Sequence, residues 1–203
     1  MTLPLYIFEE RYQKMVKTCL ETNQRRIVIV MATPPPEMGD LPDIPQTAKI
    51  GTFVDILSVM ENADGTANIL AHGQGRCHVE LSRSESVPTA EGKLSYLHYS
   101  DSRPYPLERT DPNLEQVAAW DALEVFRDYA RMFFTDDAQK QLEEALPDDL
   151  LFQASFICAN LRLEAEARQQ LLEAPSLSER FAAAQRLMLR QLEQPDLDRE
   201  SFL

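Results

Sequence analysis

The first half of this sequence has strand patterns and the second half has helix patterns, and this segregation limits the fold most strongly. Between residues 27 and 99, short apolar runs alternate with turn residues. From Leu114 onward, apolar residues recur every three or four positions instead. Strands followed by helices, without alternation of the two, predict an α+β fold with two subdomains. We place them at residues 1–102 and 103–203, with the boundary in a proline-rich linker.

The opening of the chain predicts an extended piece followed by a helix. Leu3 to Phe8 is an apolar run, which we expect to be a short, buried extended segment. The apolar spacing then changes to that of an amphipathic helix, at about residues 9–21. Ile27 to Ala32 begins with four β-branched residues and has no polar alternation, so it predicts a strand that is buried on both faces.

A long hairpin is predicted next. Lys49 to Val59 reads as a strand, and Asp64-Gly65 is a strong hairpin-turn signal because this turn needs positive φ at its central positions. The return strand runs from Asn68 to Leu81, and its Gly73–Gly75 segment indicates a bulge or sharp bend. After a polar loop, Lys93 to Tyr99 predicts one more strand. The first half is therefore a mostly antiparallel β-domain.

The second half predicts a helical bundle. Asp111-Pro112 is a good helix start, since the carboxylate can cap the first turn and the proline needs no hydrogen bond there. Further helices are expected after Pro147-Asp148, over Glu164 to Glu173, and after a capping box at Ser176 to Glu179. The first helix is expected to bury one apolar stripe, made of Val117, Trp120, Leu123, Phe126, Ala130 and Phe133.

The charge balance excludes several classes of partner. The chain has 33 acidic and 20 basic residues, for a net charge of −13. Such a chain repels phosphate backbones and anionic lipids, so we expect no nucleic-acid and no membrane binding. No apolar run approaches the roughly 18 to 20 residues that span a bilayer. Three scattered cysteines build no disulfide framework, which favours a cytoplasmic location.

The sequence contains no pattern typical of catalysis. A phosphate-binding loop and a nucleophile elbow are both absent. Cys77 and His78 point to opposite faces of a strand, so a metal site with His72 is not expected. We therefore predict no enzyme activity, no metal and no cofactor. The alternative, a hydrolase, would need a polar pocket that unites His72, His98 and a carboxylate.

One loop contains candidate binding residues. The segment from Thr33 to Ala48 is rich in proline and long enough to be either mobile or functional. Its apolar residues Met38, Leu41 and Ile44 follow no period. They either pack onto the sheet or, in a binding protein, contact a peptide.

The order of short motifs resembles that of a known family. The chain is similar to the Lon N-terminal domain, the substrate-binding domain of the ATP-dependent protease Lon. The resemblance covers nearly the whole chain and includes residues 168–188 of the helical half. The matching motifs are Leu3-Pro4-Leu5, Phe8-Glu9, Arg11-Tyr12, Met15-Val16, Gly51-Thr52, Asp64-Gly65 and Gly73-Gln74-Gly75-Arg76.

This resemblance implies a PUA-like pseudo-barrel followed by a helical bundle. It also implies a non-catalytic module that recognises unfolded or tagged protein segments, without the ATPase and protease parts of Lon. Proteins that carry this domain on a separate chain suggest an alternative. In that case the chain is an adaptor for one folded partner, such as a separately encoded protease or ATPase subunit.

The resemblance also draws attention to the start of the chain. Family members normally begin with a further apolar strand before the leucine-proline-leucine run, and this chain starts at Met1 without it. Met1 is therefore interpreted as an internal methionine of a longer reading frame. We expect an exposed sheet edge and an apolar groove beside Leu3 to Phe8, which would favour self-association.

Overall fold

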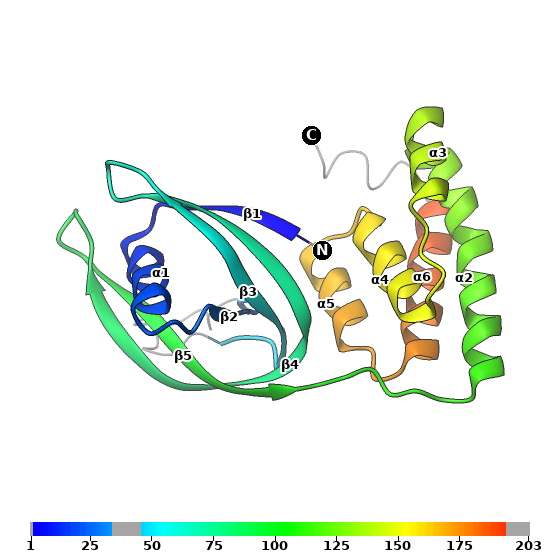
Figure 1. The fold of residues 1–203 in the computed structure, drawn as a ribbon. Helices are drawn as coiled ribbons and strands as arrows, with labels where there is room; N and C mark the ends of the chain where they lie inside the picture. Colours follow the sequence, from blue (N-terminus) through cyan, green and yellow to red (C-terminus); the bar gives the residue numbers. More distant parts are fainter. Residues whose placement is uncertain (1, 34–45, 194–203) are drawn as a thin grey trace. The chain divides into compact units, whose positions relative to one another are not determined.

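The structure is a computed structural model that describes residues 2–33 and 46–193. The chain divides into two compact units, Met1–Pro106 and Leu107–Leu203 (Figure 1). We call them the β unit and the helical unit and describe each by itself. An antiparallel sheet followed by helices confirms the predicted α+β class.

The β unit is organised around one long strand. Its elements are β1 (Thr2–Ile7), α1 (Glu10–Glu21), β2 (Arg26–Ile29), β3 (Ile50–Glu61), β4 (Ala67–Pro88) and β5 (Leu94–Pro104). All strand pairs are antiparallel, in the order β1-β4-β3-β2, and β5 pairs with the second half of β4. Figure 1 shows the long strands β3 and β4 curving around α1. Within the described residues, β1, β2 and β5 each have one edge without a neighbouring strand.

The hairpin between β3 and β4 is confirmed. Gly65 takes a φ of 87°, and the Asp64 carboxylate accepts a hydrogen bond of 3.0 Å from the Thr66 amide. Further along, Phe53 pairs with Gly75 and Val54 with Gly73, which leaves Gln74 as the extra residue of a bulge. Bulges increase the twist and bend of a strand, which explains how so long a strand curves.

Gly51 in β3 allows the backbone of β2 and the side chain of Val79 in β4 to approach closely. A Cβ atom at this position would lie 2.7 Å from the Ile29 carbonyl oxygen and 2.9 Å from Cγ2 of Val79. Both distances are far below ordinary van der Waals contact, which is about 3.5 Å or more. The glycine is therefore required by packing where β2 lies against β3.

Two predictions about burial in the β unit were wrong. Leu3 to Phe8 is not a buried segment, because Tyr6 is 56% exposed and Phe8 62% exposed, although Ile7 is buried. The strand predicted over Ile27 to Ala32 is not buried on both faces, since Ile29 is 40% exposed. The physical reason is the same in both cases: β1 and β2 are edge strands, and apolar composition does not distinguish an edge from a centre.

The polar loop predicted after Leu81 was also wrong. β4 continues to Pro88, and the turn before β5 is short, with Gly92 at a φ of 78°. The residues after Leu81 are mostly polar because part of this strand faces solvent, as antiparallel sheets allow.

The helical unit contains five described helices. They are α2 (Pro112–Phe133), α3 (Asp136–Glu144), α4 (Leu150–Asn160), α5 (Ala165–Glu173) and α6 (Leu177–Glu193). The predicted start at Asp111-Pro112 is confirmed, because the Asp111 carboxylate accepts hydrogen bonds from the next amides. The Glu179 amide donates to the Ser176 hydroxyl at 3.2 Å, as in a capping box. Helix α3 was not predicted.

The face that α2 buries differs from the predicted stripe. Phe126 is buried as expected, but Trp120 is 66% exposed and Val117 is also exposed. Small residues, Ala119 and Ala122, occupy the buried face in their place. Small side chains allow α6 and α4 to pack closely on this face, so tertiary contacts select it over the more hydrophobic stripe.

A buried carboxylate fixes the start of α2. Glu115 is 1% exposed, and the Arg109 guanidinium donates to it at 2.7 and 2.9 Å. The Thr110 amide donates a further hydrogen bond of 2.7 Å to the same carboxylate. These partners hold the pKa of Glu115 below its ordinary value, the Arg109 hydrogen bonds contributing most.

Candidate binding cavity

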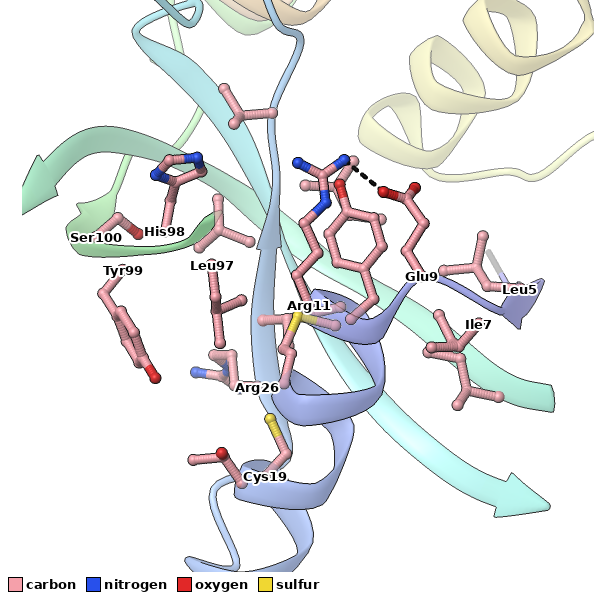
Figure 2. A pocket seen from close by; sticks show the side chains of 18 of the residues that line it. Leu5, Ile7, Glu9, Arg11, Cys19, Arg26, Leu97, His98, Tyr99 and Ser100 are labelled. Atoms are coloured by element: carbon pink, nitrogen blue, oxygen red, sulfur yellow. Dashed lines mark ion pairs between the residues drawn. The ribbon is translucent and has the colours of Figure 1, made fainter. Parts of the chain in front are cut away.

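The β unit contains a cavity of about 610 Å³, which we call the edge cavity (Figure 2). Its size lies within the range of known ligand sites, about 300 to 1,000 Å³. Side chains from α1 and from strands β1, β2, β4 and β5 line it.

The strands border the edge cavity in two different ways. From β4 it is lined by Ile69, which precedes the bulge at Gln74, and by Val79 and Leu81, which follow it and lie on one face of the strand. At β1, β2 and β5 it is lined by runs of consecutive residues, 5–9, 26–30 and 96–100, of which residues 8, 9 and 30 lie just past the ends of β1 and β2. Consecutive residues can line a cavity only where it runs along the edge of a strand, because neighbouring side chains point to opposite faces. The face of β4 that carries Val79 and Leu81 therefore forms the floor, and the edges of β1, β2 and β5 form walls.

The backbone of β2 presents unpaired groups at this wall. The Arg25 carbonyl accepts a hydrogen bond from Ile56, and the Met31 carbonyl accepts one from Ala48, so odd-numbered residues face β3. In an antiparallel strand, alternate residues direct their amide and carbonyl groups to opposite edges. The residues that direct these groups away from β3 are Arg26 and Val28 of β2 and Val30, the residue directly after it.

The backbone of β5 follows the same rule. The Tyr105 amide donates to Arg76 and the Lys93 carbonyl accepts from Thr89, so odd-numbered residues face β4. The groups that point the other way belong to Tyr96, His98 and Ser100. Among the residues that the structure describes, none forms a backbone hydrogen bond with these three residues or with the three of β2. The free edges of β2 and β5 therefore border the same cavity.

Helix α1 closes another side of the edge cavity with a single face. The lining residues recur every three or four positions, as expected for an amphipathic helix. Its buried residues Val16 and Cys19 pack with Ile7 and Ile69, and all of these except Val16 also line the cavity. The residues of α1 that line the cavity are Arg11, Tyr12, Met15, Thr18 and Cys19.

The charges around the edge cavity are paired. Arg11 forms an ion pair of 2.7 Å with Glu9, drawn as a dashed line in Figure 2. Arg26 donates to Asp55 at 2.7 Å and holds the pKa of that carboxyl below its ordinary value. Burial lowers the pKa of His98, and the nearby charge of Arg11 lowers it further, so the imidazole is neutral at pH 7. No lining charge of the described residues lacks a partner of opposite sign, which suits a neutral ligand.

The polar groups near the cavity do not assemble a hydrolase site. Ser84 Oγ lies 2.7 Å from His98 Nδ1, but Ser84 does not line the cavity. A nucleophile–histidine pair also needs a group that orients the imidazole, usually a carboxylate, whereas the charge that acts on His98 is Arg11. His72 lies outside the cavity lining, so the cavity does not bring it together with His98.

Thiols and metal ligands do not form a site in the described part of the chain. Burial raises the pKa of Cys19 and Cys77, which disfavours the reactive thiolate. No group of three or more His, Cys, Asp or Glu side chains in residues 2–33 and 46–193 is placed to hold a metal ion. No described helix is long and apolar enough to cross a membrane.

The predicted contact residues and the cavity differ. Met38, Leu41 and Ile44 lie outside the described residues, so their proposed role stays a prediction. The structure does place an apolar cavity beside Leu3 to Phe8, where the sequence predicted a groove. Its walls at β2 and β5 were missed, because nothing in the composition of residues 26–30 or 96–100 marks a strand edge.

An α+β fold with a largely apolar, edge-lined cavity defines a binding domain. The chain belongs to the family of the ATP-dependent protease La (LON) substrate-binding domain, whose model matches residues 1–190. The resemblance found in the sequence is therefore confirmed, and with it the class of substrate-binding module.

Three individual proteins are similar to this chain. The chain is 24% identical over 186 residues to a Lon protease of Vibrio parahaemolyticus serotype O3:K6 (strain RIMD 2210633), covering 89% of this chain and 22% of that protein. The N-terminal domain of a Mycobacterium avium complex Lon protease has the same fold, with a TM-score of 0.61 and 14% identity over 96% of this chain and 90% of that one. A Lon N-terminal domain protein from Xanthomonas campestris is 20% identical, with a TM-score of 0.49 over 95% of this chain and 88% of that one.

Proposed function

We propose that this chain binds protein segments that expose apolar side chains, as unfolded or tagged proteins do. The observation that carries the proposal is the edge cavity, an opening of about 610 Å³ with an apolar floor in a member of a substrate-binding family. Burial of apolar surface supplies the affinity, at about 25 cal/mol for each Å² removed from water. In this role the chain acts without chemistry of its own, as a non-catalytic module.

Exposed aromatic residues at the mouth of the edge cavity support the same function. Tyr6 and Phe8 both line the cavity, and their rings lie 6.0 Å apart. Large exposed apolar side chains that gather at a cavity mark an interaction site more reliably than single ones scattered over a surface. An apolar segment that enters the cavity would cover both rings.

The proposal is tested by capture of one test protein in its native and in its unfolded form. We choose an acidic test protein, so that attraction to a chain of net charge −13 does not contribute. The immobilised chain should retain the reduced, carboxymethylated and therefore unfolded form, and not the native form. Equal retention of both forms, or of neither, would contradict the proposal.

A matched pair of variants locates the binding. Phe8 and Leu94 are 62% and 61% exposed, but only Phe8 lines the edge cavity. Phe8→Ser should weaken retention of the unfolded form and Leu94→Ser should not. Equal loss in both variants would show that general surface hydrophobicity, rather than the cavity, causes binding.

The adaptor function is the second candidate from the sequence, with a folded protease or ATPase subunit as the partner. It predicts one partner that co-purifies in a fixed ratio and no preference for unfolded protein. The capture experiment therefore separates the two functions. Cytoplasmic location and self-association likewise stay predictions of the sequence.

A further inference from the structure

We propose that the bound segment adds to the sheet of the β unit as an extra strand, which pairs with the free edge of β2 and directs alternate side chains into the edge cavity. This inference rests on the proposed function and specifies the ligand: an extended, apolar, uncharged stretch of polypeptide. Addition of a peptide strand to an exposed sheet edge is a recurring mode of recognition.

The edge of β2 offers backbone hydrogen-bonding groups that an added strand can use. Arg26, Val28 and Val30 direct amide and carbonyl groups away from β3, and no described residue pairs with them. An apolar segment that displaced water from these groups without replacing the hydrogen bonds would leave them unpaired at a cost, and another backbone in extended form satisfies them in register. At about 3.3 Å per residue, the edge from Arg26 to Val30 accommodates a strand of roughly five residues.

Of the two edges whose outward-facing backbone groups are identified above, those of β2 and β5, the edge of β2 is the more accessible. Helix α1 packs against β4 and β5, which restricts access to the edge of β5. The edge of β2 is more open, since Arg26 and Ile29 are both exposed. We therefore assign the backbone pairing to β2.

The charges of the cavity lining favour an uncharged segment. The ionised residues of the cavity lining are Glu9, Arg11 and Arg26, and both arginines are paired with carboxylates. A charged segment would find no unpaired charge among them, although Nε of Arg11 has no hydrogen-bond partner among the described residues, while its own charge would lose water. An uncharged segment meets no such cost, so the lining selects neutral residues.

Backbone N-methylation of a probe peptide tests the pairing directly. The probe is a capped peptide of alternating valine and serine, labelled with a fluorophore and titrated with the unmodified chain. In a strand, all valines direct their amides to one edge and all serines to the other. N-methylation of one set should weaken binding at least about tenfold, because hydrogen bonds to β2 are lost, while N-methylation of the other set has little effect.

A pair of protein variants gives the reciprocal test. Val28→Pro removes an amide that points away from β3, so the β2–β3 hydrogen bonds remain, and proline is tolerated at such edge positions. Val28→Thr keeps the amide and the branched shape. The proline variant should lose at least about tenfold in affinity for the probe, and the threonine variant should retain it. Circular dichroism checks whether both variants are folded. If Val28→Pro does not fold, the N-methylated peptides alone test the pairing with β2.

The outcomes separate this inference from the proposed function. Suppose that the unfolded test protein is captured, but that the two N-methylated peptides both bind like the parent peptide or both do not bind. Pairing with β2 is then refuted and the proposed function stands. If the unfolded test protein is not captured, the proposed function and this inference are both refuted. A dimer that Val28→Pro converts to a monomer and that the probe does not dissociate would also overturn the inference, and would assign the edge to a second copy of the chain.

Discussion

Replacement of Gly51 by alanine tests whether close packing fixes β2 in place. The new methyl group would lie 2.7 Å from the Ile29 carbonyl oxygen and 2.9 Å from Val79 Cγ2. The first neighbour is backbone of β2, which cannot rotate away, so β2 must shift outward. Overpacking of this kind costs about 1–3 kcal/mol. Loss of glycine freedom in the unfolded chain returns about 0.4–1 kcal/mol, which leaves a net destabilisation of roughly 1–2 kcal/mol.

Gly73 and Gly75, which flank the bulge residue Gln74 in β4, provide controls for the same glycine-to-alanine change. A Cβ at Gly73 would come no closer than 3.8 Å to another atom, that of Thr52, and one at Gly75 would meet nothing within 4 Å. Neither has a positive φ. Gly73→Ala and Gly75→Ala should therefore leave stability unchanged or raise it slightly, through the unfolded state alone.

Amide hydrogen exchange followed by mass spectrometry is the appropriate assay, because it reports on the two units separately. In Gly51→Ala, peptides from β2 and β3 should exchange faster by a factor of roughly 5 to 30, which corresponds to 1–2 kcal/mol. Peptides from α2 and α6 should be unchanged. If Gly51→Ala exchanges like Gly73→Ala, close packing does not hold β2 against β3, and the reasoning fails.

Three further predictions concern the helical unit, and thermal unfolding of that unit measures each. Phe126→Ala should lower the free energy of unfolding by about 3–5 kcal/mol and Trp120→Ala by less than about 0.5 kcal/mol, because only Phe126 is buried. Similar losses in the two variants would refute the observed orientation of α2. Arg109 lowers the pKa of Glu115 in the folded state. The Arg109–Glu115 pair therefore adds its full contribution to the free energy of unfolding above the ordinary carboxyl pKa of about 4.3, and this contribution is lost as the pH falls through the lower folded pKa. Glu115→Gln should reduce this acid dependence, and an unchanged pH profile would contradict the assignment. Ser176→Ala should cost about 1 kcal/mol through loss of the helix cap, whereas Ser176→Thr should cost little; equal losses would argue against capping.

Features that depend on neighbouring residues were predictable from the sequence. The turn at Asp64-Gly65, the bulge around Gln74 and the cap at Asp111 each depend on local backbone requirements that a few residue types satisfy. The capping pair Ser176 and Glu179 belongs to the same group. Such signals identify where elements begin and turn.

Features that depend on distant contacts were not predictable in the same way. The choice of the Ala119 face of α2 over the Trp120 face depends on how closely α6 and α4 approach, which no periodicity in α2 encodes. The edge cavity is a stronger case. Its walls exist because β2 and β5 are terminal members of the strand order, and residue types such as Val28 and His98 are equally compatible with a central strand. Only the groove beside Leu3 to Phe8 could be anticipated, through the family resemblance.

The strand order also has a consequence during protein synthesis. Strand β1 emerges from the ribosome well before residues 67–72 of β4, its partners. Joining segments so far apart closes a large loop, which slows folding, whereas the β3–β4 hairpin closes over a few residues. The hairpin is therefore expected to form early, and β1 then pairs with its β4 strand. A chain that is proposed to hold unfolded segments of other proteins would thus itself spend part of its synthesis with an apolar, unpaired strand, and would need protection from early aggregation.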